Sequence, residues 1–352
     1  MRIITSPLHA HHNPPSEILD GELKPYFESP ERVAIITAAL AAAGFPVPEA
    51  PQAFGLEPIL AVHQPDYAEY LATAYERWVA AGLPSTAVQP CTFAMPGLRA
   101  RSNSLQGLAG RYSFDLSVPI TAGTYTAALA SAEVALSGAA LLLAGERAAY
   151  ALCRPPGHHA ATAMAGGYCF FNNAAIAAHY LATAGDQGEP TNWAMRPPVV
   201  AVLDIDFHHG NGTQAIFYER SDVFFVSIHA DPDREYPYFL GYADERGAHA
   251  GEGYNLNLPL PAGIDDAAYL VALEQALTAI QGYDPRYLIV SAGLDTFAGD
   301  PLGDFAVTTA GFAQIGQQIA QLGLPTLFVQ EGGYAINALG RNLVSLLEGF
   351  VN

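Results

Sequence analysis

The stretch LDIDFHHGNGT, residues 203–213, does most to decide the fold of this 352-residue chain. An apolar run, PPVVAVLDID, leads into it and predicts a buried strand, and Gly210 and Gly212 then let the backbone turn sharply into a helix. Because side chains alternate along a strand, Asp206 and His208 are expected to point to the same side of its end. Ligand sites of open parallel α/β sheets lie at such carboxyl ends of strands. Taken alone, the Asp-x-His pair would be interpreted as a simple cap of the strand and its helix.

Three other segments supply matching polar groups. RPPGHHA carries two adjacent histidines, His158 and His159, on a turn made rigid by its prolines, and such a pair suits acid/base chemistry. SAGLDTFAGDPLGDF places Asp295 just after the strand pattern YLIVSAG, and LFVQEGGYA ends another strand pattern with Tyr334. By themselves these two side chains would be a helix cap and a packed surface tyrosine. Together, the four segments indicate one polar site at the edge of a sheet.

Five motifs carry a resemblance that covers nearly the whole chain: GHHA, GYCFFNNAAIAA, DIDFHHGNGTQ, GLDTFAGDP and EGGY. In this order they resemble the zinc-dependent histone deacetylase family, and most closely its bacterial acetylpolyamine amidohydrolase branch. The resemblance implies an arginase/deacetylase-like α/β fold, a doubly wound parallel sheet flanked by helices, with residues 1–352 as a single catalytic domain. A long loop insertion is expected at about 82–123, where periodicity is weak.

Helical and strand patterns alternate along the chain, as this architecture requires. Asn172 is the expected N-cap of one helix, and residues 185–198 are expected to form a polar surface excursion. The other expected elements are strands at 2–5 and 146–153 and helices from about residue 30 and at 66–81, 124–144 and 172–184.

The resemblance assigns the metal ligands. Asp206, His208 and Asp295 would bind one zinc ion per subunit. Three protein ligands and an open position are what a catalytic zinc requires, since a fourth ligand would close the site. The two-manganese arginases need more carboxylates around the Asp-x-His core, whereas His-Gly-Asn follows it here, which favours one metal.

The resemblance also assigns the catalytic groups. His159 would be the general base that takes a proton from water and later protonates the leaving amine, with Asn211 as its orienter. His158 would lie beside it, held by Asp204. An amide partner leaves an imidazole closer to neutral than a carboxylate partner does, and this difference separates the two histidines. Tyr334 would donate its hydroxyl to the developing oxyanion.

Structural potassium is a further implication of the resemblance alone. One site would use Asp204, with backbone carbonyls of Asp206 and His208, together with Ser227 and Ile228. A second monovalent site would use backbone oxygens near Phe217, Arg220 and Val223.

Departures from the polyamine branch concern the substrate. In that branch acidic side chains face the distal ammonium of the substrate, but the corresponding positions here are Gln106 and Ser117, and Leu302 replaces a glutamate. Burying an ammonium against a neutral wall costs free energy. We therefore expect modest turnover of acetylpolyamines, unless the nearby Asp115 turns inward.

A narrow aromatic channel is expected to lead to the metal. Tyr168, which follows Gly167, and Tyr236 would line it, and so would Phe170 unless it is a simple core aromatic. Such a channel suits a slim alkyl chain or a small amide.

Composition narrows the partners and the location. The net charge of −19 argues against the basic patch of a nucleic-acid-binding protein and suits cationic small molecules. Three cysteines without a CxxC motif indicate reduced thiols and a cytoplasmic setting, and no apolar stretch is expected to reach membrane-spanning length. Only 14% of residues are charged, so we expect a homodimer in which the loop at 82–123, with Phe93, Met95 and Leu98, covers part of the surface.

The sequence thus predicts a zinc-dependent amide hydrolase for a small, slender substrate such as an acetylated polyamine. Two alternatives stay open: the same chemistry on a neutral amide or an acyl-lysine peptide, and a non-catalytic protein that binds acyl ligands. The presence of a general base argues against the second, because binding alone does not require one.

Overall fold

The computed structural model describes residues 1–19, 21–95, 101–184 and 199–352. Its centre is a seven-stranded sheet of parallel strand pairs in the order β1-β4-β9-β8-β5-β6-β7. The predicted α/β class with a doubly wound parallel sheet is confirmed. The strands of this sheet are β1 (Arg2–Ile4), β4 (Ala148–Ala151), β5 (Val200–Asp204), β6 (Val223–Ala230), β7 (Asn255–Leu260), β8 (Tyr287–Ala292) and β9 (Thr326–Gln330).

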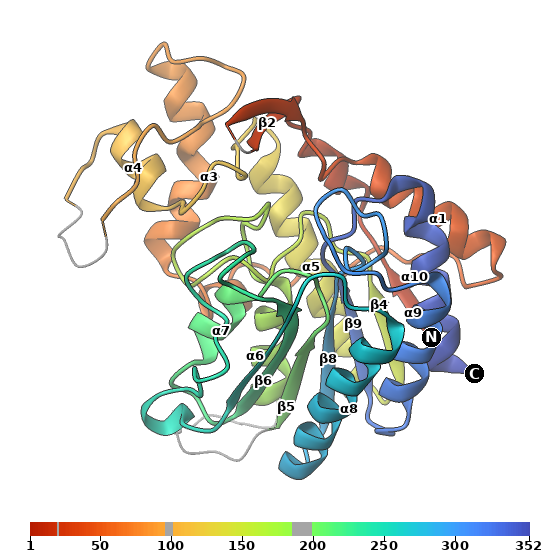
Figure 1. Cartoon of the computed structure of the whole chain (residues 1–352). Coiled ribbons are helices and arrows are strands. Elements are labelled where there is room, and N and C mark those ends of the chain that lie inside the picture. Colours follow the sequence, from red (N-terminus) through yellow and green to blue (C-terminus); the bar gives the residue numbers. More distant parts are fainter. Residues whose placement is uncertain (20, 96–100, 185–198) are drawn as a thin grey trace.

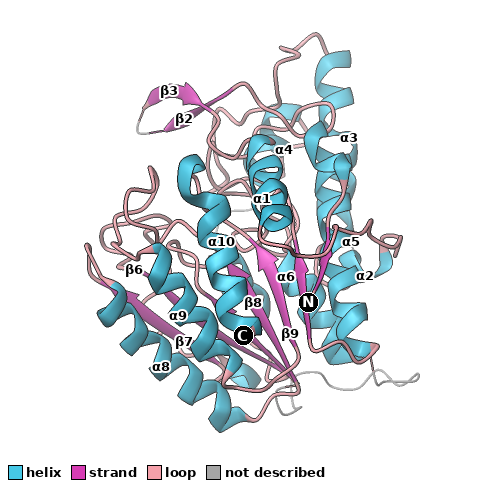
Figure 2. Ribbon diagram, turned by 90° about the vertical axis from the view of Figure 1, so that its right-hand side faces the viewer, coloured by secondary structure: helices cyan, strands magenta, loops and turns pink. Residues whose placement is uncertain are grey.

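Two hydrophobic cores cover the two faces of the sheet, because successive side chains of a strand point to opposite faces. In β5, Val200 and Val202 belong to one core, and Ala201 and Leu203 belong to the other. Figure 2 shows several helices of the second core across one face of the sheet. The first core takes in α3 (Pro65–Ala80), α5 (Thr124–Leu143), α6 (Asn173–Thr183) and α7 (Asn211–Phe217), and the second takes in α1 (Glu31–Ala42), α8 (Asp266–Tyr283), α9 (Thr309–Ala320) and α10 (Ile336–Val351).

The expected helices near residue 30 and at 66–81, 124–144 and 172–184 correspond to α1, α3, α5 and α6. The predicted cap of α6 is present, since the Asn172 side chain accepts a hydrogen bond from the Ala175 amide at 2.9 Å. A short helix, α2 (Glu57–Leu60), precedes α3. The predicted excursion at 185–198 lies outside the described residues, as does Leu98.

The loop at 82–123 contains a helix that its sequence pattern did not predict, α4 (Leu105–Arg111). Gly107 and Gly110 weaken its helical sequence pattern, because glycine is a poor helix former. Ser104 caps it by accepting a hydrogen bond from the Gly107 amide at 3.1 Å. The Tyr112 hydroxyl, at its end, donates to Asp66 of α3 at 2.8 Å, so this part of the loop is fixed to the fold.

Helix α5 overturns the expectation that no apolar stretch reaches membrane-spanning length. The helix has 20 residues, and an 18-residue stretch of it has a mean hydropathy of 1.6, so it is long and apolar enough to cross a membrane, but 67% of that stretch is buried inside the fold. Its apolar composition is therefore explained by its place in the first core, where it packs against α6 and β4.

A separate antiparallel hairpin, β2 (Ser16–Leu19) with β3 (Glu22–Pro25), lies at the end of the molecule toward which the parallel strands point, as does α4 (Figure 1). The polar motifs follow the carboxyl ends of β4, β5, β8 and β9, so they meet at this end.

Candidate active site

The polar group beyond β5 and β8 has the geometry of a metal site. Asp206, His208 and Asp295 each offer one ligand atom, and these atoms lie within 4.8 Å of one another. His208 Nδ1 is 3.2 Å from both Asp206 Oδ1 and Asp295 Oδ2. Asp295 Oδ2 is buried and receives no hydrogen bond. Carboxylates that converge in a dry interior need a cation between them, and this mixed oxygen and nitrogen set fits zinc.

Backbone groups hold the two carboxylates in place. The amide of Gly332 donates to Asp206 Oδ2 and the amide of Phe207 donates to Asp295 Oδ1, each at 2.9 Å. A Cβ at Gly332 would lie only 2.2 Å from Asp295 Oδ2, and one at Gly293 would lie 2.0 Å from Asp206 Oδ2. Glycine is therefore required at both positions for the ligands to approach each other.

The two adjacent histidines have different partners. The imidazole Nδ1 of His158 donates to Asp204 Oδ2 at 3.0 Å, whereas Nδ1 of His159 donates to the side-chain carbonyl of Asn211 at 2.7 Å. Their rings lie 3.9 Å apart, centroid to centroid, and both are buried. Because Nδ1 of His159 is used, its Nε2 is left for the pocket that this residue lines. The predicted pairings with Asp204 and Asn211 are thus both present.

These partners give the histidines opposite protonation. Burial lowers the pKa of His158, but the Asp204 and Asp206 carboxylates outweigh it and raise that pKa to about 10. Burial, followed by the charges of His158 and His208, lowers the pKa of His159 well below its ordinary value. At neutral pH His158 is therefore an imidazolium and His159 is a neutral imidazole that can accept a proton.

Tyr334 reaches the site from the loop after β9. Its amide donates to Asp300 Oδ2 at 2.7 Å, and the Arg32 guanidinium lies 5.0 Å from the centre of its ring. Burial raises the pKa of the Tyr334 hydroxyl well above its ordinary value, so the phenol keeps its proton and can donate it in a hydrogen bond.

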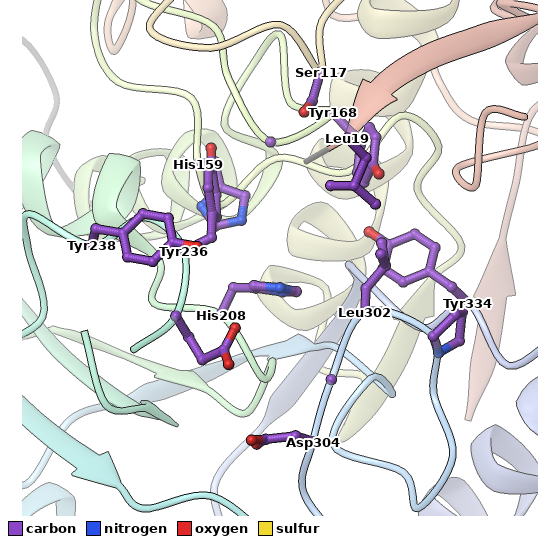
Figure 3. Close-up of a pocket in the computed structure, with 14 residues that line it drawn as sticks. Leu19, Ser117, His159, Tyr168, His208, Tyr236, Tyr238, Leu302, Asp304 and Tyr334 are labelled. Atoms are coloured by element: carbon purple, nitrogen blue, oxygen red, sulfur yellow. The ribbon is translucent and has the colours of Figure 1, made fainter. Parts of the chain in front are cut away.

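One pocket of about 420 Å³ connects these groups with the surface. Figure 3 shows His159, Tyr236 and Tyr238 on one side of it and Leu302 and Tyr334 on the other. The pocket lining comprises Leu19, Ser117, His159, Gly167, Tyr168, His208, Glu235, Tyr236, Tyr238, Pro301, Leu302, Gly303, Asp304 and Tyr334.

Most residues predicted for the substrate channel belong to this lining, namely Ser117, Gly167, Tyr168, Tyr236 and Leu302. Gln106 does not, since it is exposed on α4. Phe170 is a core aromatic, fully buried and packed in the first core.

The Asp115 side chain points inward, which is the exception that the sequence analysis allowed to a neutral wall. Its carboxylate, however, already accepts hydrogen bonds from the pocket wall. Its Oδ2 accepts the Tyr236 hydroxyl at 2.6 Å and the Gly167 amide at 2.7 Å, and its Oδ1 accepts the Ser117 amide at 2.9 Å. Burial raises the pKa of Asp115 above its ordinary value, and these hydrogen bonds offset only part of that shift. Asp115 therefore fastens three parts of the pocket wall to one another.

The expectation of a neutral wall is wrong. Two acidic residues that the sequence analysis did not single out, Glu235 and Asp304, line the pocket. Glu235 stands one residue before the predicted Tyr236, and Asp304 follows the Gly-Asp-Pro motif by three positions. Acidic residues beside predicted channel residues were the available signal.

Two of the residues expected to hold potassium, Asp204 and Ser227, are neighbours in the sheet. In the sheet register Asp204 pairs with Ser227 of β6 on one side and with Ser291 of β8 on the other. The Ser227 hydroxyl is 2.8 Å from His229 Nδ1. Ile228 is fully buried, as are Phe217 and Val223, whereas Arg220 is ion-paired with Asp222.

The fold and the arrangement of this site define the class of protein. The family model of the histone deacetylase domain matches residues 26–350. The chain therefore belongs to the histone deacetylase family, as its motifs predicted, and is a hydrolase that acts on a carbon–nitrogen bond.

Relatives within the family point to its bacterial amidohydrolase branch. Acetylpolyamine amidohydrolase 2 of Pseudomonas aeruginosa is 47% identical over 351 residues, which cover 99% of this chain and 98% of that protein. Acetylpolyamine amidohydrolase of Mycoplana ramosa is 43% identical, with 99% of each chain covered. The crystal structure of acetylpolyamine aminohydrolase from Burkholderia pseudomallei matches with a TM-score of 0.92 at 42% identity, over 99% of this chain and 98% of that one.

Proposed function

We propose that this chain hydrolyses the acetyl amide of acetylated polyamines in a zinc-dependent reaction. The observation that carries the proposal is the convergence of the Asp206–His208–Asp295 group, His159 and Tyr334 on one pocket. The names of the full-length relatives supply the substrate class.

Asp206, His208 and Asp295 would hold one zinc ion per subunit. Zinc in this position supplies a Lewis acid for the amide carbonyl and makes a water molecule acidic enough to become the nucleophile. The buried Asp295 Oδ2 supports this assignment, since it accepts no hydrogen bond and lies 3.2 Å from Nδ1 of the neighbouring proposed ligand, His208.

His159 is the general base of the proposed reaction. Its Nε2 accepts the proton of the attacking water, because Nδ1 is occupied by Asn211 and the ring is neutral at pH 7. The same nitrogen then passes that proton to the amine that leaves.

His158 has a different task in this scheme. As an imidazolium paired with Asp204, it cannot accept a proton, so it contributes a fixed positive charge beside His159. That charge keeps the pKa of His159 low and stabilises negative charge that develops near the pair.

Tyr334 stabilises the oxyanion through its hydroxyl. Such a donor contributes about 3 kcal/mol to the transition state when it is preorganised. The main-chain amides of Tyr334 and Ala335 donate to the Asp300 carboxylate at 2.7 and 2.8 Å, and these hydrogen bonds supply that preorganisation.

We also propose two structural potassium sites. The first would use Asp204, Asp206, His208, Ser227 and Ile228, and the second would lie near Phe217, Arg220 and Val223. Support for the first site is the register that places Asp204 beside Ser227, and the carboxylate of Asp204, which is fully buried. A cytoplasmic location and a single catalytic domain spanning 1–352 are likewise proposed.

A homodimer through the loop at 82–123 is also proposed. Phe93 and Met95 of this loop are 39% and 68% exposed, and a second subunit would cover them. Light scattering at micromolar concentration is expected to give twice the mass of one chain, and a monomer would contradict this.

A substrate panel tests the function. We expect release of acetate from acetylputrescine and acetylcadaverine at higher kcat/KM than from an acetyl-lysine peptide or a neutral N-alkylacetamide. Preference for the neutral amide would support the first alternative, and binding of acetyl amides without turnover by zinc-loaded protein would support the non-catalytic one.

A further inference from the structure

We propose that Glu331 and Asn172 are positioning residues that hold the general base His159 in place, an inference that rests on the proposed function. Both side chains are fully buried, and neither belongs to the pocket lining that the structure describes. Each binds main-chain groups of the turn at 154–160, here called the histidine turn because it carries the base. Their contribution to turnover is therefore made through His159, without contact with the substrate.

The histidine turn depends on support from other segments. It has no regular secondary structure apart from a turn in which the Ala160 amide donates to the Gly157 carbonyl at 3.0 Å. Pro155 and Pro156 have no amide hydrogen to donate. Hydrogen bonds from outside the turn must then fix the position of the base.

Glu331 joins the histidine turn to the loop that carries Tyr334. Its Oε2 accepts the Gly157 amide at 2.6 Å and the His158 amide at 3.2 Å. Its own main-chain carbonyl accepts the Arg32 guanidinium of α1 at 2.6 Å. The carboxylate thus extends from a fixed backbone, three residues before Tyr334, and amide bonds to a buried carboxylate are strong. Glu331 therefore sets where the base lies relative to the oxyanion donor.

Asn172 joins the other end of the histidine turn to α7. Its Nδ2 donates to the Ala160 carbonyl and to the Thr213 hydroxyl, both at 3.0 Å, while its Oδ1 caps α6. The Thr213 amide donates in turn to the His158 carbonyl at 3.1 Å. Because α7 begins with Asn211, these bonds fix the distance between the base and the amide that orients it.

The surroundings of the base transmit any shift of the turn to its ring. A Cβ at Gly167 would overlap the His159 ring, and a Cβ at Gly212 would overlap the Ala160 carbonyl. The ring is therefore closely enclosed, and its Nε2 follows the backbone that carries it. A displacement of about 1 Å in a reacting group can lower a rate by about 100-fold.

Two variants test the inference with two substrates. Acetylcadaverine carries an ammonium where N-hexylacetamide carries a methyl group, so both use the same amide chemistry. Glu331→Ala and Asn172→Ser should each lower kcat for both substrates by about 10- to 100-fold, with KM within about twofold of the wild type. Serine caps a helix as well as asparagine does, so Asn172→Ser keeps the cap of α6.

The conservative variant Glu331→Gln should restore most of the lost rate. Its side-chain carbonyl can accept the same two amides, so we expect kcat to return to about a third of the wild-type value. Loss of kcat in Glu331→Gln as large as in Glu331→Ala would show that the hydrogen bonds to the turn are not what matters.

A double variant separates positioning of the base from a general loss of structure. Where His159→Ala has already removed the base, Glu331→Ala or Asn172→Ser should lower the residual kcat by less than about twofold. A structural defect would instead lower kcat by the same factor with and without His159. Where Glu331→Ala does not fold, Asn172→Ser in both backgrounds decides.

Asn342→Ala is the matched control. It removes a buried hydrogen bond of 2.6 Å between Thr309 of α9 and Asn342 of α10, and should lower the urea midpoint of unfolding but leave kcat per zinc-loaded chain unchanged. Equal losses in the presence and absence of His159, or wild-type kcat in both Glu331→Ala and Asn172→Ser, would overturn the inference. Failure of the zinc-loaded wild type to hydrolyse either substrate would refute the proposed function instead.

Discussion

The base and the mouth of the pocket differ in how their polar groups are satisfied. At the base, Asp204, Asp206 and Asp295 are fully buried, and each accepts hydrogen bonds from main-chain amides or a histidine. At the mouth, Tyr238 is 49% exposed, and the Asp304 carboxylate lies where water reaches it. From this difference we expect the reaction and its selectivity to depend on separate residues. Changes at the base should affect all amide substrates alike, and changes at the mouth should alter their ratio.

Among substitutions that leave the proposed metal ligands in place, removal of the general base should have the largest effect on turnover. His159→Ala is expected to lower kcat by a factor of about 100 to 10,000 for acetylcadaverine and N-hexylacetamide alike, because both need a proton acceptor at Nε2. Steady-state kinetics with unchanged circular dichroism would show it. A loss confined to one of the two substrates would contradict the claim that residues at the base of the pocket act on all amide substrates alike.

Tyr334→Phe should come next, with a decrease of about 100-fold in kcat. KM should change less than kcat, because the hydroxyl bonds most strongly to charge that develops only in the transition state. Turnover near that of the wild type would mean that another group stabilises the oxyanion.

Replacing Asn211 with aspartate tests whether the amide partner keeps His159 neutral. In Asn211→Asp a negative charge faces Nδ1, which favours the imidazolium and raises the pKa of His159. The base then stays protonated up to a higher pH, so the acidic limb of kcat/KM should move upward and the rate at pH 7 should fall by about tenfold. A pH profile that matches the wild type would show that His159 does not act as the base.

Tyr236→Phe should have the smallest effect on catalysis. It removes the hydroxyl that donates to Asp115 and leaves two amide donors on that carboxylate. We expect the free energy of unfolding in urea to fall by about 1.5 kcal/mol, since one charge-assisted hydrogen bond is lost. The kcat for N-hexylacetamide should fall less than threefold, and a loss as large as that of Tyr334→Phe would place Tyr236 in the reaction.

The base of the pocket was predictable from sequence because short motifs follow buried strands. Asp206 and His208 lie in the loop just after β5, which ends at Asp204, and the parallel register of β5 and β8 brings Asp295 beside them. The expected partners of His158 and His159 were also found.

The mouth was less predictable because loops from distant parts of the sequence form it. No periodicity tells where the Asp115 side chain points, and its partners Gly167 and Tyr236 lie 52 and 121 residues away. Correspondence with family positions suggested Gln106, which is exposed, and passed over Asp304. Helix α4 was not predicted for a different reason. Its glycines weaken the helical pattern, and contact with α3 stabilises the helix instead.

Zinc content measured together with activity tests the central claim most directly. We predict about one zinc ion per chain in the wild type by mass spectrometry, loss of zinc and of acetylcadaverine turnover in Asp206→Ala, and full occupancy in Asp304→Asn. Chelation should abolish wild-type turnover and added zinc should restore it. Full zinc occupancy with full activity in Asp206→Ala, or undiminished turnover by metal-free protein, would contradict the account.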